Sequence, residues 1–197
     1  VETVVTKDEK QVKPTQIVMV LDRSGSMDSI GKATVDGINS FIKEQKAAEG
    51  EAFMTLTQFD DRYEVTYKER PINEVQDLIL GETFVPRATT ALYDAIGRTI
   101  NELKTEDDVV FVIVTDGMEN ASREFDRHAI FEKIDQKKKE GWTFLFLAAN
   151  QDAMETGAGF GISGKNAMSY NANSTSVNAT FSNISGKMSS YRSAKFT

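Results

Sequence analysis

The segment DRSGSM, residues 22–27, places a carboxylate and two serines at alternate positions directly after the apolar run QIVMVL. Because side chains alternate along extended backbone, Asp22, Ser24 and Ser26 can face one way while Arg23 points the other way. A glycine between the two serines permits tight curvature. Such a segment suits a turn, a phosphate cradle, a nucleophile site or a metal cage, and the rest of the chain must discriminate between them.

Further oxygen-bearing side chains lie at the ends of other expected elements. Asp116 follows the apolar run VVFVIVT, and Thr89 and Thr90 precede a helical pattern over residues 91–103. In parallel sheets, sites form beyond the carboxyl ends of strands, so we expect these side chains to meet Asp22 at one edge. The donors are all oxygens, a set that suits Mg²⁺, Mn²⁺ or Ca²⁺. Two carboxylates and neutral hydroxyls would leave one position on the ion open for water or an external carboxylate.

Apolar runs of strand length alternate with helical patterns along the chain. Three continuous apolar runs are typical of strands covered on both faces: 16–21, 109–114 and 142–149. Residues 53–59 are read as a further strand. Residues 62–69 alternate between polar and apolar side chains, which predicts a half-exposed edge strand paired with 53–59. Asp60 and Asp61 are interpreted as the tight turn of this hairpin.

Helical spacing of apolar residues predicts the remaining elements. The expected helices cover residues 29–47, a short piece from Pro71 to about Leu80, 91–103 and 124–140. We expect Ser29 to cap the first helix. In the helix over 124–140 we expect Ile130, Phe131 and Ile134 to face inward.

The C-terminal segment is rich in Ser and Asn but carries a regular apolar pattern. Its apolar residues recur at helical spacing and form one stripe: Val177, Phe181, Ile184, Met188 and Tyr191. Asn173 or Ser174 is the expected cap of this helix. Before it, AMSY reads as a last edge strand. The glycine-rich residues 157–164 read as a close-packed loop, because they lack the strand-then-helix setting of a dinucleotide site.

Together these elements predict an α/β fold with a mostly parallel central sheet, one antiparallel edge strand, and helices on both faces. The length of 197 residues suits a single domain with a sizeable core. We assign that domain to residues 16–197, including the C-terminal helix. Residues 1–15 are mixed and charged, and we interpret them as a tail or an edge extension.

Composition excludes several classes of function. The chain has no cysteine, which removes disulfides, thiolate metal sites and cysteine catalysis. A net charge of −7 argues against nucleic acid as a partner. No apolar run approaches the ~20 residues that span a bilayer, and no leader is visible. We therefore expect a cytoplasmic protein without a membrane span, with an extracellular location as the alternative. After Glu155 the charged residues are all basic, which suits a packing segment or, alternatively, a docking surface.

Three segments resemble the motifs of von Willebrand factor A domains. DRSGS matches the family's D-x-S-x-S motif, and ATTALYDAI (88–96) and TDGMEN (115–120) are similar to its threonine loop and its fourth-strand aspartate. The resemblance covers about residues 15–150 and extends to the C-terminal helix. It implies a three-layer, Rossmann-like fold that carries a metal-ion-dependent adhesion site.

The resemblance also implies a set of metal ligands. Asp22, Ser24 and Ser26 would be the ligands of the first loop, and Thr90 and Asp116 would complete the set. In the family, the serines and the threonine usually coordinate the ion directly and the aspartates often act through water. The family commonly has Gly-Gly-Thr where this chain has Ala-Thr-Thr, so Thr89 remains an alternative to Thr90.

The implied function is a metal-dependent protein-binding module, not an enzyme, in which the ion binds an Asp or Glu carboxylate of a partner protein. The first alternative is a Mg²⁺-dependent phosphatase of the haloacid-dehalogenase type, but its general acid would occupy the position of Ser24. A serine hydrolase lacks a base, because His128 is the only histidine and lies on a predicted helix away from the strand ends. The second alternative is a scaffold in which a metal ion only holds loops together.

Overall fold

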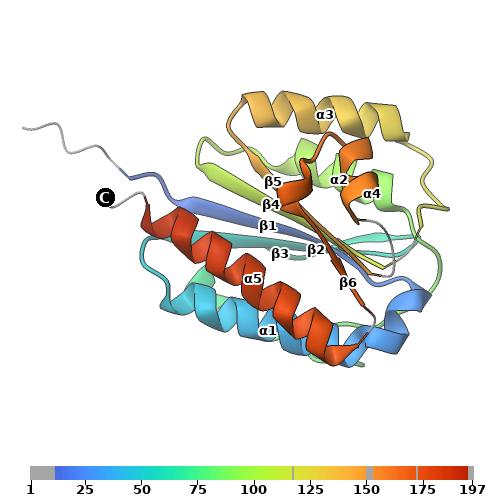
Figure 1. Ribbon diagram of the computed structural model, residues 1–197, viewed down its shortest axis with the longest axis horizontal. Coiled ribbons are helices and arrows are strands. Elements are labelled where there is room, and N and C mark those ends of the chain that lie inside the picture. Colours follow the sequence, from blue (N-terminus) through green and yellow to red (C-terminus); the bar gives the residue numbers. More distant parts are fainter. Residues whose placement is uncertain (1–11, 117, 150–152, 172, 195–197) are drawn as a thin grey trace, which may run out of the picture.

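The computed structural model describes residues 12–116, 118–149, 153–171 and 173–194 (Figure 1). Six strands form one sheet in the order β3-β2-β1-β4-β5-β6, and β3 alone among them runs antiparallel to its neighbour. The strands are β1 (Thr15–Asp22), β2 (Ala52–Phe59), β3 (Tyr63–Pro71), β4 (Asp108–Thr115), β5 (Thr143–Ala149) and β6 (Ala167–Tyr170). The predicted sheet, with its antiparallel edge strand, is confirmed.

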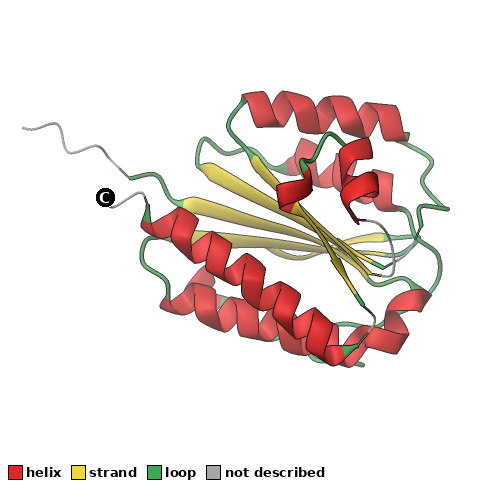
Figure 2. Ribbon diagram, viewed as in Figure 1, coloured by secondary structure: helices red, strands yellow, loops and turns green. Residues whose placement is uncertain are grey.

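Helices cover both faces of this sheet and complete three layers (Figure 2). They are α1 (Gly31–Ala47), α2 (Leu92–Glu102), α3 (Arg127–Lys139), α4 (Ala153–Gly159) and α5 (Ser174–Ser193). Helices α1 and α5 pack on one face, and α2, α3 and α4 pack on the other (Figure 1). None of the described helices is long and apolar enough to cross a bilayer.

Strand β1 lies at the centre of the sheet and is buried along its whole length. Its odd-numbered residues Ile17 and Met19 join the core beneath α1 and α5, while Val18 and Val20 join the core beneath α2 and α3. This two-sided burial is the reason that the strand reads as a continuous apolar run instead of an alternating one.

Helix α5 confirms the apolar stripe that the C-terminal sequence predicts. Phe181 is buried and packs so tightly on α1 that a Cβ at Gly37 would lie 2.5 Å from its ring. The side chain of Asn173 caps the helix by accepting a hydrogen bond from the Ser176 amide at 2.9 Å. The stripe therefore anchors the C-terminal helix on the sheet, against α1.

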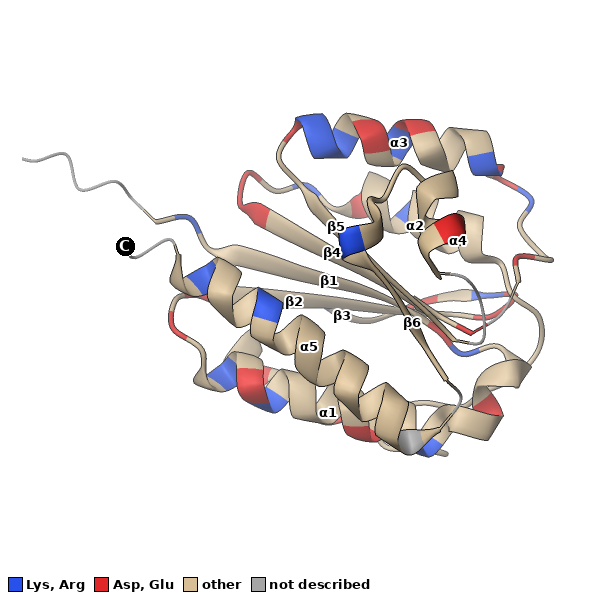
Figure 3. Ribbon diagram, viewed as in Figure 1, with Lys and Arg blue, Asp and Glu red and all other residues tan. Residues whose placement is uncertain are grey.

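The basic bias of the C-terminal segment is partly internal. Figure 3 shows basic but no acidic residues on α5. One of them, Arg192, is buried and donates hydrogen bonds to the backbone carbonyls of Gln45, Ala48 and Gly50 at the end of α1. Burial lowers the pKa of this guanidinium. Arg192 thus caps the end of α1, as expected of a packing segment.

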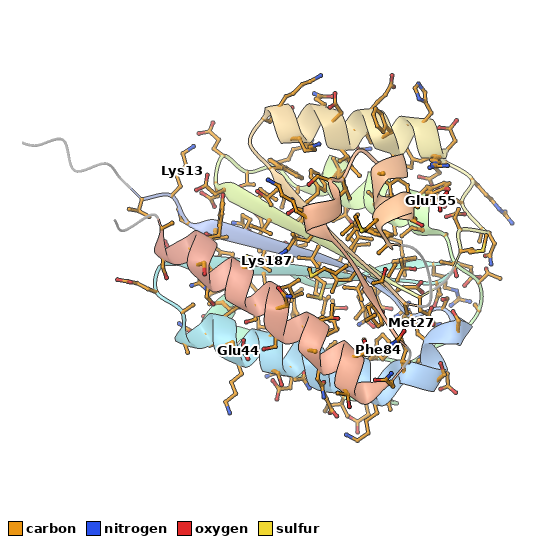
Figure 4. The ribbon with its side chains drawn as sticks, viewed as in Figure 1. Lys13, Met27, Glu44, Phe84, Glu155 and Lys187 are labelled. Carbon is orange, nitrogen blue, oxygen red and sulfur yellow. The ribbon has the colours of Figure 1, made fainter. Side chains whose placement is uncertain are left out.

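The first helix begins differently from the prediction. A 3-10 turn over Gly25–Ile30 precedes α1, and Ser29 lies inside it instead of capping the helix. The hydroxyl of Ser29 donates to the carbonyl of Ser26 at 3.2 Å. Met27 of this turn is buried in the core of the α1 and α5 face, as is Phe84 (Figure 4). The apolar anchor at Met27 turns the chain tightly before the α-helix can start.

The expected helix from Pro71 to Leu80 is wrong. Only a 3-10 turn over Ile72–Glu74 forms, and the chain then continues without helix along α1. Leu78 enters the core, and its amide and carbonyl both hydrogen-bond to the side chain of Asn39, at 2.8 and 2.9 Å. The side chain of Asn39 thus satisfies backbone groups that a helix would otherwise pair.

Two smaller expectations also need correction. On α3, Ile130 and Ile134 are buried as predicted, but Phe131 is 39% exposed, because its position lies away from the face that the other two share. The glycine-rich residues 157–164 are not wholly a loop, since α4 extends to Gly159.

Candidate metal centre

Two predicted carboxylates come together because their strands are neighbours. Asp22 is the last residue of β1, and Asp116 directly follows β4. The two strands run parallel and pair in register from Thr15 with Asp108 to Leu21 with Val114. Both side chains therefore lie at the carboxyl edge of the sheet, where parallel α/β folds form their sites.

Hydrogen bonds join four of the predicted ligands into one cluster. Asp22 accepts from the Ser24 amide at 2.7 Å through one carboxylate oxygen and from the Thr115 hydroxyl at 2.6 Å through the other. The hydroxyls of Ser24 and Ser26 lie 3.1 Å apart. The Ser26 hydroxyl donates to a carboxylate oxygen of Asp116 at 2.7 Å. The alternating residues of the D-x-S-x-S segment thus converge on the carboxylate after the next strand.

The threonine loop lies against this cluster through its backbone. The Gly25 amide donates to the Ala88 carbonyl at 3.1 Å, and a Cβ at Gly25 would lie 3.4 Å from the same oxygen. Ala88 has a φ of 57°, a left-handed conformation that is uncommon for a residue with a side chain. The loop therefore passes close to the D-x-S-x-S turn.

The two candidate threonines differ in their surroundings. Thr90 is buried, whereas Thr89 is exposed. The Thr90 amide donates to the side-chain oxygen of Asn120 at 2.9 Å, and its carbonyl accepts from the amides of Asn120 and Ala121. These bonds fix Thr90 against the segment that follows β4. Its hydroxyl forms no hydrogen bond with the four clustered side chains in the described part of the chain.

Burial dominates the electrostatics of both carboxylates. It raises the pKa of Asp22, and hydrogen bonds from Ser24 and Thr115 offset only part of this effect. Burial also raises the pKa of Asp116 to about 6, with the Ser26 hydrogen bond opposing and the charge of Asp22 reinforcing the shift. Among residues 12–116, 118–149, 153–171 and 173–194, no Lys, Arg or His forms an ion pair with either carboxylate.

This arrangement fits a divalent cation. Buried Asp22 and half-buried Asp116 repel each other, and beside a pair of hydroxyls they present hard oxygen donors and a negative charge that no described side chain neutralises. No group of three or more Asp, Glu, His or Cys side chains suited to a metal gathers in the described residues. Any ion at this edge would therefore rely on the hydroxyl oxygens of Ser24 and Ser26 as well as on carboxylates.

The structure adds residues to the site that the sequence reasoning missed. The Thr115 hydroxyl holds Asp22, and the Asn120 side chain holds Thr90. Tyr170, on β6, is buried and its hydroxyl donates to the Thr115 carbonyl at 3.4 Å. The first two lie in the TDGMEN segment, which marked the region. Nothing local marks Tyr170, because its place depends on the order of the strands.

A cavity of about 240 Å³ opens next to the cluster on the α2 and α3 side. Its floor is apolar, with Phe146 and Phe160 buried, and Thr115 belongs to its lining. Arg127 and Met118 also line it, and Met118 is 77% exposed. Glu119 and Glu155 line it as well, so the cavity is of mixed polarity, and Thr115, which holds Asp22, relates it to the cluster.

Comparison with known proteins gives a fold but no sequence relative. No protein-family model and no curated protein sequence matches the chain. The von Willebrand factor domain of the type V pili tip protein Mfa5 from Porphyromonas gingivalis superposes with a TM-score of 0.69 at 12% identity, over 90% of this chain and 95% of that one. The chain has a von Willebrand factor A fold.

Two larger proteins share the same fold. Proximal thread matrix protein 1 from the mussel byssus superposes with a TM-score of 0.66 at 13% identity, over 90% of this chain and 46% of that one; the structure has zinc in its metal-ion-dependent adhesion site. The pilus adhesin SpaC from Lactobacillus rhamnosus GG gives 0.70 at 14% identity, over 91% of this chain and 30% of that one. The chain thus spans less than half the length of either protein.

Proposed function

We propose that this chain is a metal-dependent protein-binding module of the adhesion type. The observation that carries the proposal is a pair of carboxylates, buried Asp22 and half-buried Asp116, which the Ser24 and Ser26 hydroxyls bridge and which no described basic side chain neutralises. A von Willebrand factor A fold that has zinc at the corresponding kind of site in another protein supports the same function.

The proposed ligands are Asp22, Ser24, Ser26, Thr90 and Asp116. Mg²⁺ is the proposed ion, with Mn²⁺ or Ca²⁺ as alternatives, because all donors are hard oxygens. When bound, the ion supplies a positive charge with an open position for an external carboxylate. Thr115 orients Asp22, and Asn120 orients the backbone of Thr90. Thr90 is favoured over Thr89 because it is the buried member of the pair.

The proposed partner is a protein that presents an Asp or Glu side chain. The surroundings of the site suit a protein surface, because the adjacent cavity offers a partner both the rings of Phe146 and Phe160 and charged side chains such as Arg127. Exposed Met118 at its rim is an adaptable apolar contact. The net charge of −7 disfavours nucleic acid as the partner.

The phosphatase alternative finds less support. The position that a general acid would occupy is Ser24, and it hydrogen-bonds to another hydroxyl. No lysine or histidine hydrogen-bonds to the four clustered side chains in the portion that the structure describes. His128 lies exposed on α3 beside Glu132, so it cannot serve as a base for either serine. The scaffold alternative, in which the ion only ties loops together, differs from the proposal in lacking a carboxylate-bearing partner.

Thermal unfolding with Mg²⁺ or with EDTA tests the metal site. Mg²⁺ at 100 times its Kd should stabilise the wild type by about 2.7 kcal/mol, since the ion binds only the folded state. Asp22→Ala should lose this shift. Asp28→Asn is the matched control, because Asp28 is an exposed carboxylate in the same 3-10 turn, and it should keep the shift.

Two further measurements separate the three functions. Peptides that carry Asp or Glu should bind the Mg²⁺-loaded chain, and their Asn or Gln counterparts should not. Mg²⁺-dependent hydrolysis of a generic phosphate ester that Asp22→Asn abolishes would instead support the phosphatase. A Mg²⁺ shift in unfolding without any carboxylate-dependent binding would support the scaffold.

A further inference from the structure

A third carboxylate at the same edge of the sheet is built into an ion-pair cluster. Asp60 directly follows β2, and its side chain is fully buried. One of its carboxylate oxygens accepts from Arg23 Nε at 3.1 Å and from Arg87 Nε at 2.7 Å. The other accepts from the Arg62 amide at 2.7 Å. Asp60 is thus more than the hairpin turn that the sequence suggests.

The two arginines belong to the two loops that carry the proposed metal ligands. Arg23 lies between Asp22 and Ser24, and Arg87 lies three residues before Thr90. Because side chains alternate in extended backbone, Arg23 points away from the cluster that Asp22 and Ser24 join. It reaches Asp60 instead, and also Glu64 at 2.9 Å. The arginine within the D-x-S-x-S motif therefore connects the loop after β1 to the β2–β3 hairpin.

Backbone hydrogen bonds run alongside these ion pairs. The Arg87 amide donates to the Arg23 carbonyl at 2.8 Å, and the Arg23 amide donates to the Phe59 carbonyl at 2.8 Å. The Asp60 carbonyl accepts from the Ala91 amide at 2.9 Å. Phe59 and Asp60 thus bind the backbone of Arg23, which follows Asp22, and of Ala91, which follows Thr90.

We infer that Asp60 is a positioning residue for the proposed metal centre, which it serves by clamping the two ligand loops together through Arg23 and Arg87. The inference rests on the proposed metal-binding function. Asp60 forms no hydrogen bond with Asp22, Ser24, Ser26 or Asp116 in the described residues, so it acts on the ion only through the loops.

The clamp matters because loops must be ordered before they can offer several ligands at once. Ordering the backbone of one residue costs about 1–2 kcal/mol. If the loops became ordered only when the ion binds, this cost would reduce the free energy of metal binding. The left-handed conformation of Ala88, between Arg87 and the threonines, adds to this cost. The ion pairs of Arg23 and Arg87 with Asp60 hold both ligand loops in place before an ion binds. Removing such outer partners of a metal site typically costs about 10–100-fold in metal affinity.

Isothermal titration of Mn²⁺ and Mg²⁺ into folded protein tests the inference. Asp60→Asn should weaken the ion's Kd by about 10–100-fold relative to the wild type. Asp77→Asn is the matched control, because it removes the same charge from an exposed residue that forms no ion pair among the described residues. This control should bind within about threefold of the wild type, as expected of an exposed charge.

A second pair of variants keeps the test valid if Asp60→Asn does not fold. The Arg87 side chain is 45% exposed, so Arg87→Gln should leave the fold intact. It should still weaken the Kd, by about tenfold, the lower end of the effect of outer partners. Arg87→Lys restores one charged donor toward Asp60 and should recover most of the affinity. A merely structural role would not produce this rescue in a Kd measured on folded protein.

Each outcome decides a different statement. A wild-type chain that binds neither ion overturns the proposed metal site, and the inference with it. Wild-type binding with an unchanged Kd in folded Asp60→Asn and Arg87→Gln overturns the inference alone. The same holds if the variants lower the unfolding temperature equally with Mg²⁺ and with EDTA, because Asp60 would then stabilise the fold without acting on the ion.

Discussion

Three carboxylates lie at the carboxyl ends of three neighbouring strands, and they differ in whether a basic side chain of the described structure pairs with them. Asp60, after β2, is buried together with the guanidinium of Arg23 and bonded to that of Arg87. Burial alone would raise its pKa, but the hydrogen bonds and charges of its neighbours outweigh burial and lower it. Asp22 on β1 and Asp116 after β4 have no such partners in the described structure, and burial raises the pKa of both.

The comparison shows that this chain can neutralise a buried carboxylate and does so one strand away. Asp22 and Asp116 lie beside a neutralised carboxylate but have no ion-pair partner in the described structure. This arrangement costs free energy, and the packing of the fold does not require that cost. Perturbed carboxylates of this kind cluster at functional sites. The contrast therefore distinguishes a carboxylate that is neutralised within the fold from the pair at which we propose the metal ion binds.

Removing the Asp60 carboxylate should have the largest effect on the fold itself. Asp60→Asn leaves buried Arg23 with only the exposed Glu64 as a charged partner and should lower the free energy of unfolding by about 3–5 kcal/mol, as for other broken buried pairs. Urea unfolding followed by circular dichroism in EDTA measures it. A loss under 1 kcal/mol would mean that Asp60 stabilises the fold no more than Asp22 and Asp116 do, which would contradict the inferred difference between the three carboxylates.

Metal binding at the other two carboxylates should depend on pH. Because the pKa of Asp116 in the folded state is about 6, above its unfolded value of 3.8, its stabilising proton is present at low pH and lost as the pH rises through about 6. Mg²⁺ must displace this proton, so below pH 6 the Mg²⁺ affinity should fall by about tenfold per pH unit, or ~1.4 kcal/mol.

Titration calorimetry with Mg²⁺ between pH 5 and 8 measures this dependence. Asp28→Asn should follow the wild-type profile, because that carboxylate is exposed. A Mg²⁺ affinity that stays constant down to pH 5 would show that neither Asp22 nor Asp116 holds a proton that competes with the ion.

Neutralising Asp22 should stabilise the metal-free protein, the reverse of the effect at Asp60. Asn has the same shape, can accept from the Ser24 amide and can donate to the Thr115 hydroxyl, so Asp22→Asn removes the charge without losing the contacts. We expect a gain of about 0.5–2 kcal/mol in EDTA at neutral pH, typical of relieving an unfavourable functional site. Urea unfolding measures the gain, and destabilisation in EDTA would contradict it.

The exposed side of the ion-pair cluster should contribute least. Glu64 accepts from Arg23 Nη1, but its side chain is 58% exposed and its attraction is screened by solvent. Glu64→Gln should therefore change the free energy of unfolding by less than about 1 kcal/mol, in line with exposed pairs. A loss as large as that of Asp60→Asn would place the anchor of Arg23 at Glu64 instead of Asp60.

The sequence alone predicts elements whose burial is uniform. The continuous apolar runs become β1, β4 and β5, the strand predicted at 53–59 becomes β2, and the stripe from Val177 to Tyr191 becomes α5, because each is packed along its full length or on one regular face. It fails where tertiary contacts replace local ones. Asn39 satisfies the backbone at Leu78 where a helix was expected, and Met27 draws the chain into a 3-10 turn that displaces the expected cap at Ser29.

The same division applies to the candidate site. Residue types and alternation within DRSGS, together with the aspartate after VVFVIVT, were sufficient to nominate Asp22, Ser24, Ser26 and Asp116, because parallel strands bring their carboxyl ends to one edge whatever the details of packing. The partners of these residues depend on strand order and loop paths, which local patterns do not encode. Only the tertiary structure places Tyr170 behind Thr115. It also decides that the arginine of DRSGS pairs with Asp60 and that no basic side chain of the described residues forms an ion pair with Asp22 or Asp116.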